Sequence, residues 1–155
     1  ITIGLTLGPL PSLASYNAVQ QDLAASAWPV FIGIGALITG RTLWWAIPDQ
    51  SSDRATGMKT PPVQYGAFRT ILIACMATII GLGLLGWSLW SRYGPLPALL
   101  ATTTGATFIL SKFALLRRLS NQMVPNCTYM RRRSLSSVTV ADVLFVLIPL
   151  IAAAS

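Results

Sequence analysis

The sequence predicts an all-α integral membrane protein with four transmembrane helices arranged as two hairpins. Three observations predict this fold: the composition, the spacing of the apolar segments, and the distribution of lysine and arginine. Of the 155 residues, 54% are hydrophobic and 10% are charged, whereas soluble domains carry ~25% charged residues. So few charged side chains cannot cover the surface of a soluble protein of this size.

Four segments are long enough to cross a bilayer, which takes roughly 20 mostly apolar residues in a helix. They span residues 28–47, 71–90, 96–116 and 136–154. The second contains no charged residue, and the other three contain one each: Arg41, Lys112 and Asp142, respectively. The sequence therefore predicts four membrane-spanning helices.

The ends of these segments carry turn residues and interfacial aromatics. Pro48 ends the first segment, and Gly94 followed by Pro95 predicts a tight turn that makes the second and third segments a hairpin. Trp44 and Trp87 lie near segment ends, where tryptophan is enriched at the membrane interface.

The basic residues are concentrated in two of the loops. The first loop region contains Arg41, Arg54, Lys59 and Arg69, and the third contains Lys112, Arg117, Arg118, Arg131, Arg132 and Arg133. The second loop contains only Arg92. By the positive-inside rule both basic loops face the cytosol, stroma or matrix, which places both termini on the trans (lumenal) side.

The chain divides into a short N-terminal region and a membrane domain. Residues 1–27 are predicted to form a trans-side interfacial segment, and residues 28–155 the four-helix transmembrane domain. Residues 1–15 are also consistent with the remnant of a signal sequence, because an apolar stretch leads into small residues.

The residue types present argue against several functions. The net charge of +7 is explained by the loops beside apolar segments, so no nucleic-acid partner is expected. Histidine is absent, which removes the commonest ligand for haem, for metal ions and for chlorophyll magnesium. We find no serine–histidine pair, no clustered carboxylates and no phosphate-binding glycine loop, so the chain is expected not to be an enzyme.

Two features inside the predicted helices allow a structural and a functional interpretation. Glycines recur at 33, 35, 40, 81, 83 and 86, where they would allow close helix packing or leave room for a flat pigment or a lipid. Asp142 would be either a proton-carrying group of a small transporter or channel, or a carboxylate paired with arginines at the interface.

Three short stretches resemble a known family. Residues 93–103 read Tyr-Gly-Pro-Leu-Pro-Ala-Leu-Leu-Ala-Thr-Thr, residues 38–41 read Ile-Thr-Gly-Arg, and residues 139–144 read Thr-Val-Ala-Asp-Val-Leu. These stretches resemble PsaK and PsaG, peripheral subunits of photosystem I that form a two-helix hairpin with a stromal basic loop. The present chain departs from that family in its four predicted spans and in lacking the histidine of the family pattern.

The resemblance implies a peripheral subunit that packs against other membrane subunits and antenna proteins and holds chlorophyll a, carotenoid and lipids. Without histidine, the magnesium ligands it implies would be amides, and those near the predicted membrane surface are Gln64, Asn121 and Gln122. The sequence thus favours a non-catalytic accessory subunit of photosystem I in the thylakoid membrane. The alternatives are an accessory subunit of a respiratory complex or ATP synthase in the mitochondrial inner membrane, and a small transporter or channel that uses Asp142.

Overall fold

The described part of the chain is entirely helical. The structure, a computed structural model, describes residues 27–116 together with the single positions 10, 14, 140, 143, 147 and 151. Within residues 27–116 the elements are α3 (Trp28–Trp45), α4 (Gln50–Ala55), α5 (Pro61–Tyr65), α6 (Ala67–Tyr93) and α7 (Pro95–Leu116). The prediction of an all-α chain is confirmed for this part.

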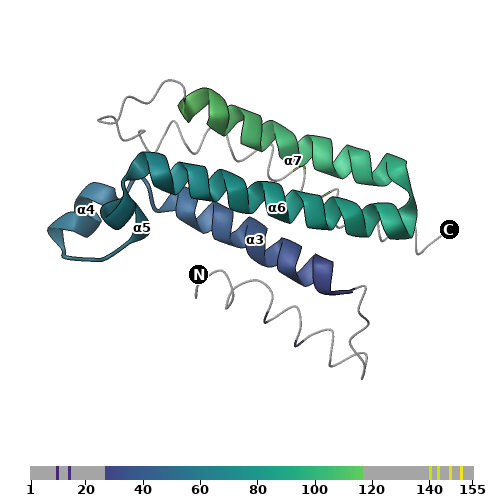
Figure 1. Cartoon of the computed structure of the whole chain (residues 1–155), viewed down its shortest axis with the longest axis horizontal. Helices are drawn as coiled ribbons and strands as arrows, with labels where there is room; N and C mark the ends of the chain where they lie inside the picture. Colours follow the sequence, from purple (N-terminus) through teal and green to yellow (C-terminus); the bar gives the residue numbers. More distant parts are fainter. Residues whose placement is uncertain are drawn as a thin grey trace.

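Three long helices lie antiparallel in a row, with α6 between α3 and α7 (Figure 1). They coincide with the first three segments predicted to cross the membrane. The fourth segment lies outside the described residues except for single helical positions, and so do both termini. The count of four spans and the trans location of the termini therefore stay predictions.

Helix α6 is the central helix of this arrangement. Its 27 residues extend over about 40 Å at 1.5 Å per residue, more than the ~30 Å hydrocarbon core of a bilayer. Within the described residues it is the helix that is long and apolar enough to cross a membrane.

Glycines bring α3 and α6 into close contact. A Cβ atom added to Gly33 would lie 3.2 Å from the carbonyl oxygen of Gly81, and one added to Gly81 would lie 2.8 Å from the carbonyl oxygen of Gly33. Nearer the other end of α3, Gly40 lies directly against the Thr78 side chain. Small side chains therefore let the two backbones touch, as is common between membrane helices.

The contact between α6 and α7 follows the same rule. Gly86 of α6 faces the Thr102 side chain, and Gly105 of α7 faces Leu82. The packing interpretation of the small residues is thus confirmed at these positions. Gly83 differs, because it is exposed and a Cβ there would meet nothing within 4 Å.

Six threonine hydroxyls in the long helices bond to the backbone of the preceding helical turn. Thr39, Thr42, Thr70, Thr78, Thr102 and Thr103 each donate to the carbonyl oxygen four residues earlier, at 2.6–2.8 Å. A hydroxyl satisfied in this way does not need water, so it is tolerated in an apolar environment.

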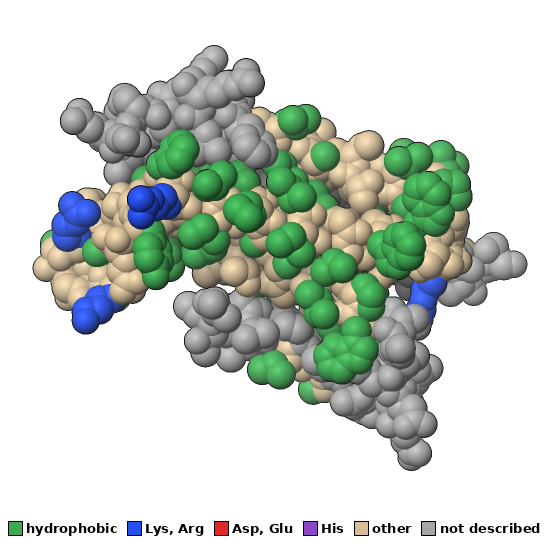
Figure 2. Space-filling model, viewed as in Figure 1, with side chains coloured by type: hydrophobic (Ala, Val, Ile, Leu, Met, Phe, Trp, Pro, Cys, Tyr) green, Lys and Arg blue, Asp and Glu red, His purple; other side chains and the backbone are tan. Residues whose placement is uncertain are grey.

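The outer surface of the bundle is apolar. Large exposed side chains cover α6 and α7, among them Met76, Ile80, Leu99 and Leu110 (Figure 2). A surface of this kind is stable in contact with lipid or with other membrane helices, but not with water.

Candidate functional site

The connection between α3 and α6 folds into a compact cap at one end of the bundle. It contains the short helices α4 and α5, which lie beyond the end of α3 and the start of α6 (Figure 1). The connection at the opposite end, between α6 and α7, is the single residue Gly94, so the two ends of the bundle differ in kind.

An apolar floor holds the cap on the bundle. Ile47 and Ile71 are completely buried and pack with Trp44 and Cys75. Pro62 of α5 is fully buried as well. The cap is therefore packed against the bundle, chiefly through α5 and α6.

Two carboxylates lie four residues apart on α4. Asp49 precedes the first residue of this helix and Asp53 lies within it, a spacing that places side chains on the same helix face. Asp49 is exposed, whereas Asp53 is 8% exposed. The carboxylate of Asp49 makes no capping hydrogen bond to the helix.

The chain after α4 turns back toward Asp53. Gly57 has a φ of +73°, which glycine adopts without strain. The Met58 N–H then donates to the Asp53 carbonyl oxygen at 2.8 Å. Two residues later, the Thr60 hydroxyl donates to Oδ2 of Asp53 at 2.8 Å. A second side-chain hydrogen bond joins α4 to α5: Nε2 of Gln50 donates to the Pro62 carbonyl oxygen at 2.6 Å.

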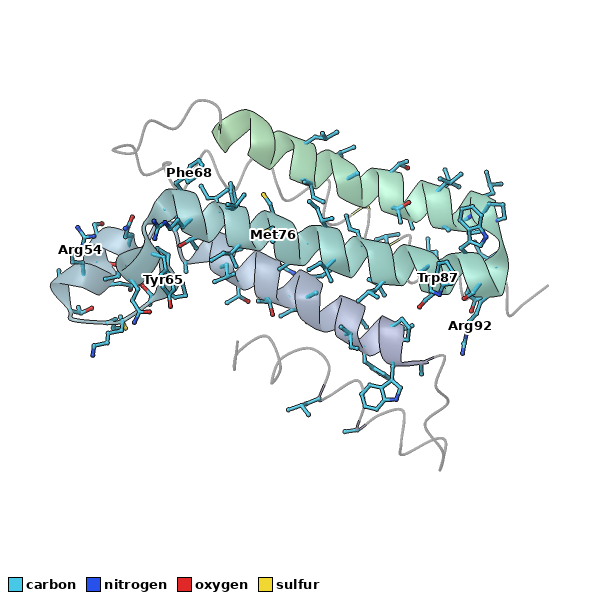
Figure 3. The ribbon with its side chains drawn as sticks, in the orientation of Figure 1. Arg54, Tyr65, Phe68, Met76, Trp87 and Arg92 are labelled. Atoms are coloured by element: carbon cyan, nitrogen blue, oxygen red, sulfur yellow. The ribbon has the colours of Figure 1, made fainter. Side chains whose placement is uncertain are left out.

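Basic side chains lie at the same end of the bundle as these carboxylates. Arg54 and Lys59 are exposed on the cap, and the exposed Arg41 and Arg69 belong to the adjoining ends of α3 and α6. Lysine and arginine gather at this end in Figure 2, and Figure 3 shows Arg54 and Tyr65 there. Within residues 27–116, neither carboxylate forms an ion pair with any of these cations.

The Arg41 guanidinium carbon lies 5.9 Å from the centre of the Trp45 ring. This is cation–π geometry, which steadies an arginine while leaving its N–H donors available. Both side chains are exposed near the end of α3, where arginine and tryptophan suit a membrane interface.

The donor set of the cap suits a hard divalent cation and an anion. Carboxylate oxygens are the ligands that Mg²⁺ prefers, and proteins commonly supply one or two of them while substrate phosphates and water complete the shell. Asp49 and Asp53 meet that requirement, although no group of three or more potential ligands occurs among the described residues. Arg54 and Lys59 supply donors for phosphate oxygens.

The sequence analysis did not identify this pair. Asp49 and Asp53 are separated by three residues and followed by Arg54. That spacing was the available signal. In a loop, this spacing does not indicate that two side chains lie together. It does so only when the segment is helical, as α4 is.

Of the amides predicted as pigment ligands, Gln64 lies within the described residues. Gln64 is exposed on α5, on the same cap. Asn121 and Gln122 lie outside the described residues, as does Asp142. Their roles as ligands or proton carriers stay predictions.

Comparison with known proteins gives a family for the chain. The model of the UbiA prenyltransferase family matches residues 1–138. The chain is also 28% identical over 76 residues to a 4-hydroxybenzoate octaprenyltransferase of Sodalis glossinidius (strain morsitans). That match covers 48% of the present chain and 26% of the relative. No solved structure matches.

These findings correct the photosystem assignment. The resemblance to PsaK and PsaG is wrong, and so are the photosystem I, chlorophyll and chloroplast assignments that followed from it. The stretches that suggested it are rich in Gly, Ala, Leu and Thr, residues that recur in membrane helices because they suit close packing. Short matches of this composition therefore carry little family information.

The expectation of a non-catalytic accessory subunit is also wrong, because members of the matched family are enzymes that transfer prenyl groups. An integral membrane location is confirmed, since the family is membrane-embedded. Association with other membrane subunits and with lipids stays a prediction.

Proposed function

We propose, from the premise that the chain belongs to the UbiA prenyltransferase family, that it transfers a polyprenyl group from a diphosphate donor to an aromatic acceptor within the membrane. The observation that carries the proposal is the cap. Asp49 and Asp53 lie together there among unpaired basic side chains, at one end of an apolar bundle.

The relative supports the choice of substrates. Its name describes transfer of an octaprenyl group to 4-hydroxybenzoate. A long isoprenoid and an aromatic acid are therefore the donor and acceptor classes proposed here. The mitochondrial inner membrane remains a proposed location, whereas the thylakoid preference has lost the resemblance that supported it.

The position of the cap fits the shape of such a donor. A polyprenyl diphosphate has a charged head and a long hydrocarbon tail, so its head stays at the membrane surface while its tail enters the hydrocarbon. The cap offers charge at the end of α6, and side chains such as Met76 and Ile80 offer apolar surface along it. One donor molecule can thus contact the cap with its diphosphate and the apolar surface of α6 with its tail.

In the proposed reaction, the bond between carbon 1 of the prenyl group and the diphosphate oxygen breaks, and the electron pair leaves with the diphosphate. The acceptor forms a new bond to carbon 1 and releases a proton. The chain's own part is to bind and orient the head group. Asp49 and Asp53 would hold a divalent cation, and Arg54 and Lys59 would contact phosphate oxygens. The bound cation would supply neutralisation of the charge that develops on the leaving group.

The test is transfer of a labelled prenyl group to 4-hydroxybenzoate by the full chain in membranes. Asp49→Asn and Asp53→Asn each keep the size of the side chain and remove its charge. Each is expected to lower kcat/KM about 100-fold, since mutational loss of charge stabilisation commonly costs 10²–10³. Arg92→Gln at the opposite end is the matched control and is expected to keep full activity. Equal activity of all three variants would refute the assignment of the cap as the site.

A further inference from the structure

We infer that Thr60 is a positioning residue, whose hydroxyl fixes the Asp53 carboxylate in the orientation that binds the divalent cation. This inference rests on the proposed function, and it adds a residue that holds the ligand without touching the cation or the substrate.

The first observation is the hydrogen bond itself. The Thr60 hydroxyl lies 2.8 Å from Oδ2 of Asp53, and the two residues are seven positions apart. Among the described residues, no other side chain bonds to this carboxylate. One of its two oxygens is thus bonded to Thr60, which restricts rotation of the carboxylate about its terminal bond. Groups that hold a metal ligand in this way commonly determine affinity.

The second observation is the position of Thr60 in the chain. It precedes α5, where a threonine hydroxyl ordinarily accepts a hydrogen bond from an N–H of the first helical turn. No such bond forms here. The next two residues, Pro61 and Pro62, have no N–H to donate. A capping bond would use the hydroxyl oxygen as acceptor, whereas the bond to Asp53 uses the hydroxyl hydrogen, so Thr60 here acts as a donor to the carboxylate.

The third observation is that the segment carrying Thr60 is fixed at both sides. Gly57 makes the turn before it, and the buried Pro62, which accepts a hydrogen bond from Gln50, lies after it. Thr60 thus lies directly before α5, whose Pro62 is buried and bonded to Gln50. A donor on a rigid support fixes a ligand more accurately than one on a mobile segment.

Thr56 provides a matched control on the same cap. Its hydroxyl also bonds near Asp53, but to backbone carbonyl oxygens, at 3.0 Å to Ser52 and 3.2 Å to Asp53. Removal of this hydroxyl leaves the Asp53 carboxylate and its Thr60 contact in place. The two threonines therefore separate an effect on the carboxylate from a general effect on the cap.

The experiment measures Mn²⁺ binding to the purified full chain by electron paramagnetic resonance, with no prenyl donor present. Thr60→Val replaces the hydroxyl by a methyl group, and Thr60→Ala removes it without adding a methyl group. Both are expected to weaken Mn²⁺ binding about tenfold, the lower end of the range for loss of a group that orients a metal ligand. Thr60→Ser, which keeps the hydroxyl, and Thr56→Val are expected to bind as the wild type does. Circular dichroism checks that each variant is folded.

Transfer activity provides a second readout. For Thr60→Val, the Mg²⁺ concentration that gives half the maximal rate is expected to rise about tenfold, with kcat at saturating Mg²⁺ largely kept. A variant that merely disturbed the fold would lose kcat as well.

The outcomes distinguish the inference from the proposed function. If Asp53→Asn weakens Mn²⁺ binding but neither Thr60→Val nor Thr60→Ala does, the role of Thr60 is refuted and the site stands. If Asp53→Asn binds Mn²⁺ as the wild type does, the cation site is refuted and the role of Thr60 falls with it. Equal losses for Thr60→Val and Thr56→Val would also overturn the inference.

Discussion

The two ends of the helical bundle connect their helices in different ways. Between α3 and α6 the chain forms a cap with two short helices, paired carboxylates and side-chain hydrogen bonds. Between α6 and α7 it turns at Gly94 alone, beside the exposed Trp87 and Arg92 (Figure 3). The capped end carries the ligands proposed above, whereas the turn end has the residue types of a membrane interface.

The two connections differ because reversing the chain and binding a ligand have different structural requirements. A turn that only reverses the chain needs one residue with positive φ, and Gly94 supplies it with a φ of +86°. A site that holds an anionic head group needs several groups in fixed positions, which takes a longer connection with its own apolar floor. Matched substitutions at the two ends test this division.

The largest effect is expected where a buried side chain is truncated at either end of the bundle. Ile47→Ala beneath the cap and Leu89→Ala near the turn each remove a buried side chain, so each should lower stability by about 2–4 kcal/mol. Ile47→Ala should also lower kcat/KM, because Ile47 lies just before α4 and its carbonyl oxygen accepts a hydrogen bond from the N–H of Gln50, the first residue of α4. Thermal unfolding in detergent and the transfer assay measure the two quantities. Equal losses of activity in the two variants would contradict the division.

A smaller effect is expected for the exposed cations. Arg54→Gln and Lys59→Gln should each raise the KM for the prenyl diphosphate several-fold with little change in kcat, since they remove contacts made by the bound phosphates. Their loss should also weaken the dependence of KM on ionic strength. Arg92→Gln should leave KM and its salt dependence unchanged. A rise in KM for Arg92→Gln would show that the effect is not confined to the cap.

The smallest effect is expected at the two glycines with positive φ. Gly57→Ala and Gly94→Ala place a Cβ where no atom lies within 4 Å, so only the backbone is strained. The strain costs about 1–2 kcal/mol at Gly57 and about 1–3 kcal/mol at Gly94, whose φ of +86° and ψ of −179° are nearly restricted to glycine. Gly57→Ala should also reduce transfer about twofold, because it strains the turn that brings Thr60 to Asp53. Gly94→Ala should leave activity unchanged while lowering the melting temperature. Gly57→Asn should be milder than Gly57→Ala, since asparagine tolerates this conformation.

The sequence by itself determined the helical class, the approximate limits of three long helices and the turn at Gly94. It also determined which end carries the positive charge, since Arg41, Arg54, Lys59 and Arg69 gather at the capped end as their positions predicted. These features depend on local patterns: runs of apolar residues, helix-breaking residues, and charges that cannot enter the hydrocarbon. Such patterns are visible without knowing which helix touches which.

Only the tertiary structure decided which residues meet. Hydropathy does not show that Gly33 faces Gly81 or that α6 lies between α3 and α7, because helices with similar apolar surfaces can pack in several orders. It does not show that Asp53 is buried or that Thr60 bonds to it. A connection rich in polar residues is predicted to be a solvated loop, and it becomes a site only when an apolar floor fixes its side chains in place.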